Sequence, residues 1–137
     1  MYKKILVTVK AAKGAKDAIH TAFQVAEQLN ASVHMITVEY EGSKEVDTSS
    51  IEWMENAVKS SEFKNVPEVT FEVIHINPGE NLAEKVAVVA AGFDMIVMGH
   101  CKYKKIYKFL HESVAEDLIC ISPCPVMIVP VDCGNAN

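Results

Sequence analysis

The chain contains no arginine, and all thirteen of its positively charged residues are lysines. Arginine supplies the planar, bidentate group that grips phosphate or guanine. Any anion site must therefore rely on lysine ammonium groups and backbone N–H groups. The formal net charge of -5 also argues against a nucleic-acid platform, because binding to that backbone depends on clustered positive charge. We do not expect nucleic acid as a partner.

Long apolar runs and paired cysteine motifs are missing too. The longest apolar segments have the length of strands, whereas a membrane span needs about 18 to 20 apolar residues. The opening MYKKILVTVK lacks the pattern of a cleavable signal, so we expect a cytoplasmic protein that stays out of the membrane. The four cysteines include no CxxC pair, and we expect reduced thiols.

Motifs of catalysis and of metal binding are also lacking. The five histidines show no HxxxH spacing, and Cys120 and Cys124 lie on either side of Pro123 near an expected helix end. There is no GxSxG elbow, no Walker lysine motif and no complete dinucleotide fingerprint. We therefore predict neither a metal site nor an enzyme.

The chain does have apolar residues in quantity. They make up 50% of the residues, which is enough for one sizeable core. A chain of 137 residues is too short for two ordinary domains. We expect a single domain over residues 1–137.

The spacing of the apolar residues alternates between the patterns of strand and helix. Continuous or alternating runs predict strands, and stripes with a period of 3.6 residues predict helices between them. The expected strands cover 5–9, 32–38, 69–76, 95–98 and 125–131, and the expected helices cover about 15–29, 51–58, 82–90 and 114–121. This β-α alternation predicts an α/β fold, with an open, mainly parallel sheet and helices on both faces.

The last expected strand begins at Pro125, ends at Val131 and contains Pro130. Proline cannot donate a hydrogen bond to a neighbouring strand, so it is found at sheet edges. We expect this strand at an edge of the sheet.

Ligands of open parallel sheets bind beyond the carboxyl ends of the strands. Two expected loops lie there, at 10–14 and 99–112. The second holds a cluster of lysines and tyrosines: Lys102, Tyr103, Lys104, Lys105, Tyr107 and Lys108. This cluster is either a site that attracts phosphate and covers a base or sugar, or a solvated loop whose lysines offset nearby acids.

Several segments resemble the universal stress protein family in their order and spacing. They are the opening MYKKILVTV, Gly79 before the third helix, GFDMIVMGH at 92–100, Ser113-Val114, and SPCPVMIVP at 122–130. The resemblance implies an adenine nucleotide alpha hydrolase-like sheet of five strands in the order 3-2-1-4-5. It also implies a homodimer formed along the last strand, which would cover an apolar edge.

Family members that bind ATP share a glycine motif after the fourth strand. The first glycine and the final hydroxyl correspond to Gly99 and Ser113, whereas Lys102 and Glu112 replace the other two glycines. Glycine lets the backbone approach ribose and phosphate closely, and Glu112 adds negative charge at a helix start. The resemblance therefore implies an incomplete phosphate site.

The adenine end of the implied site is altered as well. The family's aspartate and small residues after the first strand correspond here to Lys10, Ala11 and Ala12, while Val38 keeps a pocket-lining position. The candidate nucleotide-binding residues are thus Lys10, Val38, Met98, Gly99, Lys102 and Ser113.

Three hypotheses follow. The first is a non-catalytic regulatory dimer of the stress response without tight ATP binding, acting on a protein partner that the sequence does not identify. The second is a protein that binds ATP or AMP, in which Lys102, Lys104 and Lys105 replace backbone contacts to phosphate. The third is a redox sensor using Cys101.

Ser113 and Cys101 each have a second interpretation. Ser113 and Glu116 have the spacing of a capping box, which gives the serine a structural role besides phosphate contact. Cys101 follows His100 beside the lysine cluster, where positive charge would lower a thiol pKa, but the pair is also compatible with a plain loop.

Overall fold

The computed structural model describes residues 2–9, 15–40, 49–60, 65–101 and 114–131. Strands and helices alternate along these ranges, as the apolar spacing predicts. The strands are β1 (Lys4–Thr8), β2 (Ser32–Tyr40), β3 (Val69–Ile76), β4 (Met95–Cys101) and β5 (Val126–Val131). The helices are α1 (Ala15–Leu29), α2 (Ser49–Lys59), α3 (Leu82–Ala90) and α4 (Val114–Ile121).

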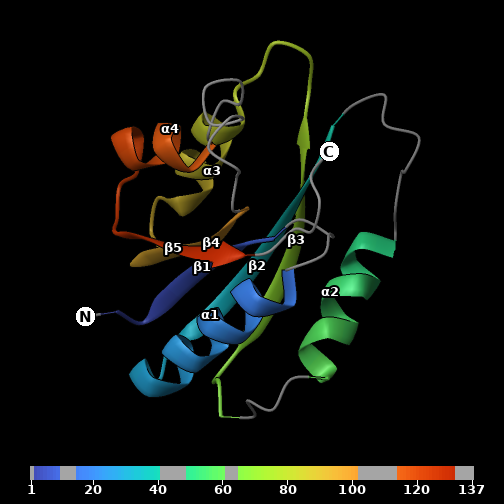
Figure 1. Cartoon of the computed structure of the whole chain (residues 1–137), viewed down its shortest axis with the longest axis vertical. Coiled ribbons are helices and arrows are strands. Elements are labelled where there is room, and N and C mark those ends of the chain that lie inside the picture. The colour runs from blue at the N-terminus through green and yellow to red at the C-terminus, as the bar shows by residue number, and fades with distance from the viewer. Residues whose placement is uncertain (1, 10–14, 41–48, 61–64, 102–113, 132–137) are drawn as a thin grey trace.

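The five strands form one sheet in which all neighbours run parallel, in the order β3-β2-β1-β4-β5. Helices α1 and α2 pack on one face, and α3 and α4 pack on the other (Figure 1). The predicted fold class and strand order are confirmed. The expectation for the strand with Pro130 is also confirmed, because β5 is an edge strand.

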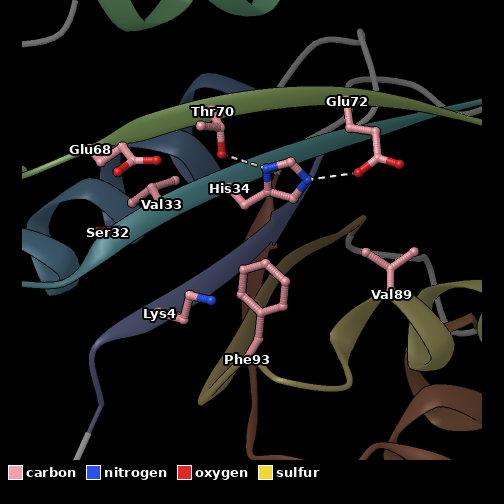
Figure 2. Close-up of a pocket in the computed structure, with 9 residues that line it drawn as sticks. All are labelled: Lys4, Ser32, Val33, His34, Glu68, Thr70, Glu72, Val89 and Phe93. Carbon is pink, nitrogen blue, oxygen red and sulfur yellow. Dashed lines mark hydrogen bonds and ion pairs between the residues drawn. The ribbon is translucent and has the colours of Figure 1, made fainter.

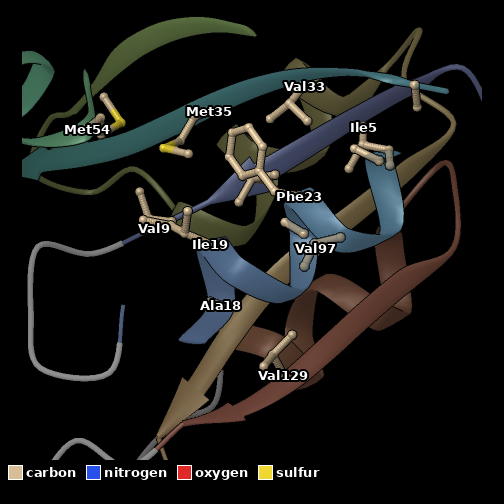
Figure 3. Packing of buried hydrophobic residues seen from close by; sticks show 14 of the residues in the cluster. Ile5, Val9, Ala18, Ile19, Phe23, Val33, Met35, Met54, Val97 and Val129 are labelled. Atoms are coloured by element: carbon tan, nitrogen blue, oxygen red, sulfur yellow. The ribbon is translucent and has the colours of Figure 1, made fainter. Parts of the chain in front are cut away.

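The sheet separates two apolar clusters. Successive side chains of β1 enter opposite clusters. Ile5 and Val7 pack in the cluster with Phe23 of α1, of which Figure 3 shows Ile5 and Phe23. Leu6 packs in the other cluster, with Leu118 of α4. This alternation follows from the two-residue period of a strand. Each large side chain of this kind contributes about 1.5 to 3 kcal/mol when it is fully buried. A central strand covered on both faces explains the unbroken apolar run near the start of the chain.

Three helix ends carry residues suited to those positions. Asn30 follows α1 with φ of 54°, the left-handed geometry that asparagine tolerates, and Gly92 follows α3 with φ of 97°. The start of α3 is capped by Asn81, whose side chain accepts a hydrogen bond from the N–H of Glu84 at 3.0 Å. These local signals fix where α1 ends and where α3 begins and ends.

Strand β4 is longer than the sequence predicts. Its apolar run suggests an end at Met98, with Gly99, His100 and Cys101 in a loop, but the strand continues through Cys101. The loop assignment of these three residues is therefore wrong. The reason is pairing with the edge strand, because Gly99, His100 and Cys101 lie opposite Val129, Pro130 and Val131 of β5.

Candidate functional site

Two of the predicted site residues flank the carboxyl end of β1. Thr8, the last residue of β1, is paired with Ile36 on one side and with Met98 on the other. Val38 lies two residues beyond Ile36, and both Val38 and Met98 pack in the cluster under α3 and α4. Their strands are separated only by β1, so the two strands lie roughly 10 Å apart, and Val38 is offset from Met98 by two residues along the strand direction. The structure thus brings Val38 and Met98 to the sheet end where nucleotide binding is predicted.

Gly99 points to the opposite face, toward α1. A Cβ atom at this position would lie 3.2 Å from the Cβ of Ala18 and 3.4 Å from Cγ1 of Val131. The distance to Val131 is an ordinary contact, whereas the distance to Ala18 is short enough that this buried neighbour would have to shift by a few tenths of an ångström. Packing against α1 therefore favours a small residue at position 99.

The other predicted site residues, Lys10, Lys102 and Ser113, lie outside the described residues. The same holds for the lysine and tyrosine cluster and for Glu112. The backbone of Cys101 is described as the last residue of β4, but its side chain is not. The phosphate half of the predicted site and the redox hypothesis remain predictions.

A second site lies at the opposite end of the sheet, where the sequence carries no motif. A cleft of about 350 Å³ opens at the amino ends of β1, β2 and β3 (Figure 2). Its lining comes from three strands, from α3 and from the turn after α3: Lys4, Ser32, Val33, His34, Glu68, Thr70, Glu72, Val89 and Phe93. The cleft combines an aromatic ring, an ammonium group and two carboxylates.

His34 joins the polar side chains of this cleft. Its Nδ1 lies 2.6 Å from Oγ1 of Thr70, and its Nε2 lies 2.8 Å from Oε1 of Glu72. The imidazole ring also stacks on Phe93, with 5.7 Å between ring centroids and an interplanar angle of 21° (Figure 2). The cross-strand pairing of His34 with Thr70 creates this arrangement. A sequence shows no such signal, because the strand register must be known first.

Lys4 and Asp94 complete the surroundings of Phe93. The ammonium group of Lys4 lies 5.6 Å from the centroid of the Phe93 ring, within the range of a cation-π contact. Oδ2 of Asp94 accepts hydrogen bonds from the backbone N–H groups of Lys3 and Lys4, at 2.8 Å and 2.9 Å. These two bonds, that of Lys3 first, hold the pKa of the Asp94 carboxyl below its ordinary value.

Comparison with known proteins identifies the family. The model of the universal stress protein family matches residues 1–130. The chain belongs to the universal stress protein family. A search of curated proteins gave no match.

Solved structures of universal stress proteins share the fold. UspA from Lactobacillus plantarum is 17% identical with a TM-score of 0.69, over 93% of this chain and 97% of that chain. A universal stress protein in complex with cAMP is 16% identical with a TM-score of 0.75, over 96% and 98%. A universal stress protein from Archaeoglobus fulgidus in complex with dAMP is 20% identical with a TM-score of 0.60, over 93% and 97%. At these identities the likeness concerns the fold.

Metal and membrane features can be judged for the part of this universal stress protein that is described. In that part, no group of three or more His, Cys, Asp or Glu side chains has an arrangement suited to a metal ion. Cys120 and Cys124 are free thiols. Within the same ranges, no helix is both long and apolar enough to cross a membrane.

Proposed function

We propose that this universal stress protein is a non-catalytic regulatory dimer of the stress response, which acts through protein contacts and lacks tight ATP binding. We further propose that residues 1–137 form one domain and that the protein works in the cytoplasm, which membership of its family supports. Family membership supports the stress role.

The packing of Gly99 is the observation that carries the proposal. Gly99 is the one motif glycine that the chain retains, and its short distance to Ala18 favours a small residue there even without a nucleotide. Lys102 and Glu112 stand where the backbone would need glycine to approach ribose and phosphate. The retained part of the motif therefore gives little support for ATP binding.

The edge of β5 supports the dimer. Along a strand, the backbone groups of successive residues face alternately toward one neighbouring strand and toward the other side. The N–H of Ile96 donates to the carbonyl of Pro125 at 2.9 Å, which shows which residues of β5 face β4. The backbone groups of Met127, Val129 and Val131 then face β4, whereas those of Val126, Ile128 and Pro130 face outward. The missing N–H of Pro130 thus falls on the free edge, and Val126 and Ile128 can pair with a second copy.

Isothermal titration with ATP, ADP and AMP tests the lack of tight binding. We expect no binding in the micromolar range, and a micromolar dissociation constant for any of the three would contradict the proposal. A matched control restores the motif with Lys102→Gly and Glu112→Gly, and the aspartate with Lys10→Asp. We expect this triple variant to gain affinity for ATP, which would show that the titration can detect binding.

Adenine-nucleotide binding is the second candidate. Two observations favour it: Val38 and Met98 lie on one face at the end of β1, and two structures with the same fold were solved with cAMP and dAMP. Lys102, Lys104 and Lys105 would then contact phosphate through charge. Changing all three lysines to glutamate should abolish both the binding and its salt dependence. Unchanged affinity for AMP or ATP would exclude this candidate.

A further inference from the structure

The free edge of β3 presents unpaired backbone groups. The N–H of Val33 donates to the carbonyl of Glu68 at 2.8 Å. This bond shows which residues of β3 direct their backbone groups toward β2 and which direct them away from the sheet. Thr70 and Glu72 therefore turn their backbone groups toward β2, and Val69, Phe71 and Val73 turn theirs outward. These three outward residues have no backbone hydrogen-bond partner within the described ranges.

Natural edge strands are often shortened, charged, interrupted by proline or a bulge, or covered by another segment. Among the described residues, the β3 edge has the charge of Glu72 but is neither short nor interrupted by proline. Strand β3 has eight residues, VTFEVIHI, with neither proline nor lysine, and it pairs with β2 over all eight. The edge therefore offers a long and regular template for an added strand.

The cleft at the amino end of the sheet lies beside this edge. Glu68, Thr70 and Glu72 share one face of β3 because they alternate in sequence, and all three line the cleft (Figure 2). The carboxylate of Glu72 is half exposed, and Glu68 is exposed as well. A strand added to β3 would lie about 4.8 Å away, so its side chains on this face would reach the two carboxylates.

We propose that the β3 edge binds an extended segment of a partner protein by strand addition, with lysine or arginine at alternate positions facing Glu68 and Glu72. The proposal rests on the proposed function, because it supplies the partner contact of a regulatory protein. Backbone hydrogen bonds would provide affinity and the cleft would provide selectivity for basic side chains. A second copy fits less well, since it would bring another acidic strand to the same edge.

Charge and backbone can be tested separately on the full-length protein with short peptides. The probe is the acetylated and amidated peptide Lys-Val-Lys-Val-Lys-Val-Lys, titrated calorimetrically at low salt. We expect binding that weakens as salt rises, and no binding of the peptide with glutamate in place of lysine. Binding of both peptides, or of neither, would overturn the proposal.

N-methylation of the peptide tests strand addition itself. Methyl groups on alternate amides block one hydrogen-bonding edge of a strand and leave the other edge intact. We expect one methylation pattern, either that on lysine or that on valine, to weaken binding at least tenfold while the other is tolerated. The sensitive pattern reports whether the added strand runs parallel or antiparallel. Equal effects of both patterns would show that the contact is electrostatic only, which contradicts strand addition.

Two protein variants locate the contact. Val73→Pro removes an N–H that faces outward, so the pairing with β2 should persist while peptide binding falls at least tenfold. Glu68→Gln with Glu72→Gln keeps an acceptor for His34 and should lower both affinity and salt dependence. Thermal unfolding checks that each variant is folded. Unchanged binding in either variant, or loss of the dimer in Val73→Pro, would refute the proposal.

These outcomes are independent of nucleotide binding. A universal stress protein that failed to bind the peptide but also ignored ATP would disprove the edge contact and leave the proposed function intact. Micromolar ATP binding together with peptide binding would disprove the lack of tight ATP binding and leave the edge contact intact.

Discussion

The two edges of the sheet differ in how they are equipped to meet another chain. Strand β5 has an apolar edge, where Pro130 removes one outward N–H and leaves those of Val126 and Ile128. Strand β3 has an acidic edge, with Glu72 on one face and with the backbone groups of Val69, Phe71 and Val73 turned outward. The same parallel sheet thus ends in two surfaces of different chemistry.

The difference indicates different partners. An apolar strand with a short stretch of free donors suits a second identical strand, because burial of apolar surface stabilises the pair without a charge conflict. An acidic edge repels its own copy and attracts a basic segment. We expect the dimer at β5 and the partner segment at β3, and the following changes test that division.

The largest effect is expected when proline is moved along β5. The N–H of Met127 faces β4, so Met127→Pro should lower the free energy of unfolding by about 2 to 3 kcal/mol through loss of the bond and an unsatisfied carbonyl. The N–H of Ile128 faces outward, so Ile128→Pro should cost less stability but weaken the dimer at least tenfold, or about 1.4 kcal/mol. Urea unfolding and analytical ultracentrifugation measure the two quantities.

The pair of variants also carries its own control. If Met127→Pro and Ile128→Pro weaken the dimer equally while both remain folded, the outward backbone groups of β5 do not bind the second copy. The dimer would then lie elsewhere on the molecule.

A smaller effect is expected when Pro130 is replaced by valine. The change restores one outward N–H on each copy, and a typical hydrogen bond contributes about 1 kcal/mol. Dimerisation should therefore tighten several-fold, or assembly should extend beyond the dimer, as light scattering at rising concentration would show. Peptide binding at β3 should stay the same. A change in peptide affinity without a change in assembly would contradict the division between the edges.

The smallest effect is expected at Asp94, which lies away from both edges and serves as a reference. Its pKa is lowered in the folded protein by the N–H groups of Lys3 and Lys4. A carboxyl with a lowered pKa stabilises the fold above its unfolded pKa of about 4 and loses that contribution as pH falls through the folded pKa. Asp94→Asn should thus be less stable than wild type at pH 7, and the gap should shrink below about pH 4.

Urea unfolding at pH 7 and at about pH 3 measures this gap. A difference that does not depend on pH would mean that the charge of Asp94 contributes nothing. Dimerisation should be unaffected at pH 7, because β5 does not include Asp94.

Local signals account for most of the fold that could be predicted. Helix α1 and strand β3 have the predicted bounds, because their apolar periods are long and regular, and that of α1 is interrupted by Asn30. The end of β4 was missed since Gly99 and His100 have little strand character of their own and are ordered by pairing with β5. Pairing with a strand distant in sequence therefore sets the end of β4, which the local sequence pattern does not show.

The site at the carboxyl end of the sheet and the cleft at its amino end also differ in how far the sequence predicts them. The position of Val38 and Met98 at the carboxyl end of the sheet could be predicted from family resemblance, and their role in binding stays a prediction. Lys10, Lys102 and Ser113 lie outside the described residues. The cleft at the amino end depends on the register that sets His34 opposite Thr70. No spacing in the sequence marks that contact, because 36 residues separate the two side chains.

An amide chemical-shift map of the labelled protein, titrated first with ATP and then with the lysine-valine peptide, tests the central claim most directly. We predict that micromolar ATP shifts no amide, and that the peptide shifts those of Val69, Phe71 and Val73 on the β3 edge. Shifts at Val38, Met98 and Gly99 with micromolar ATP, or peptide shifts confined to other surfaces, would contradict the view that this protein acts through its sheet edges.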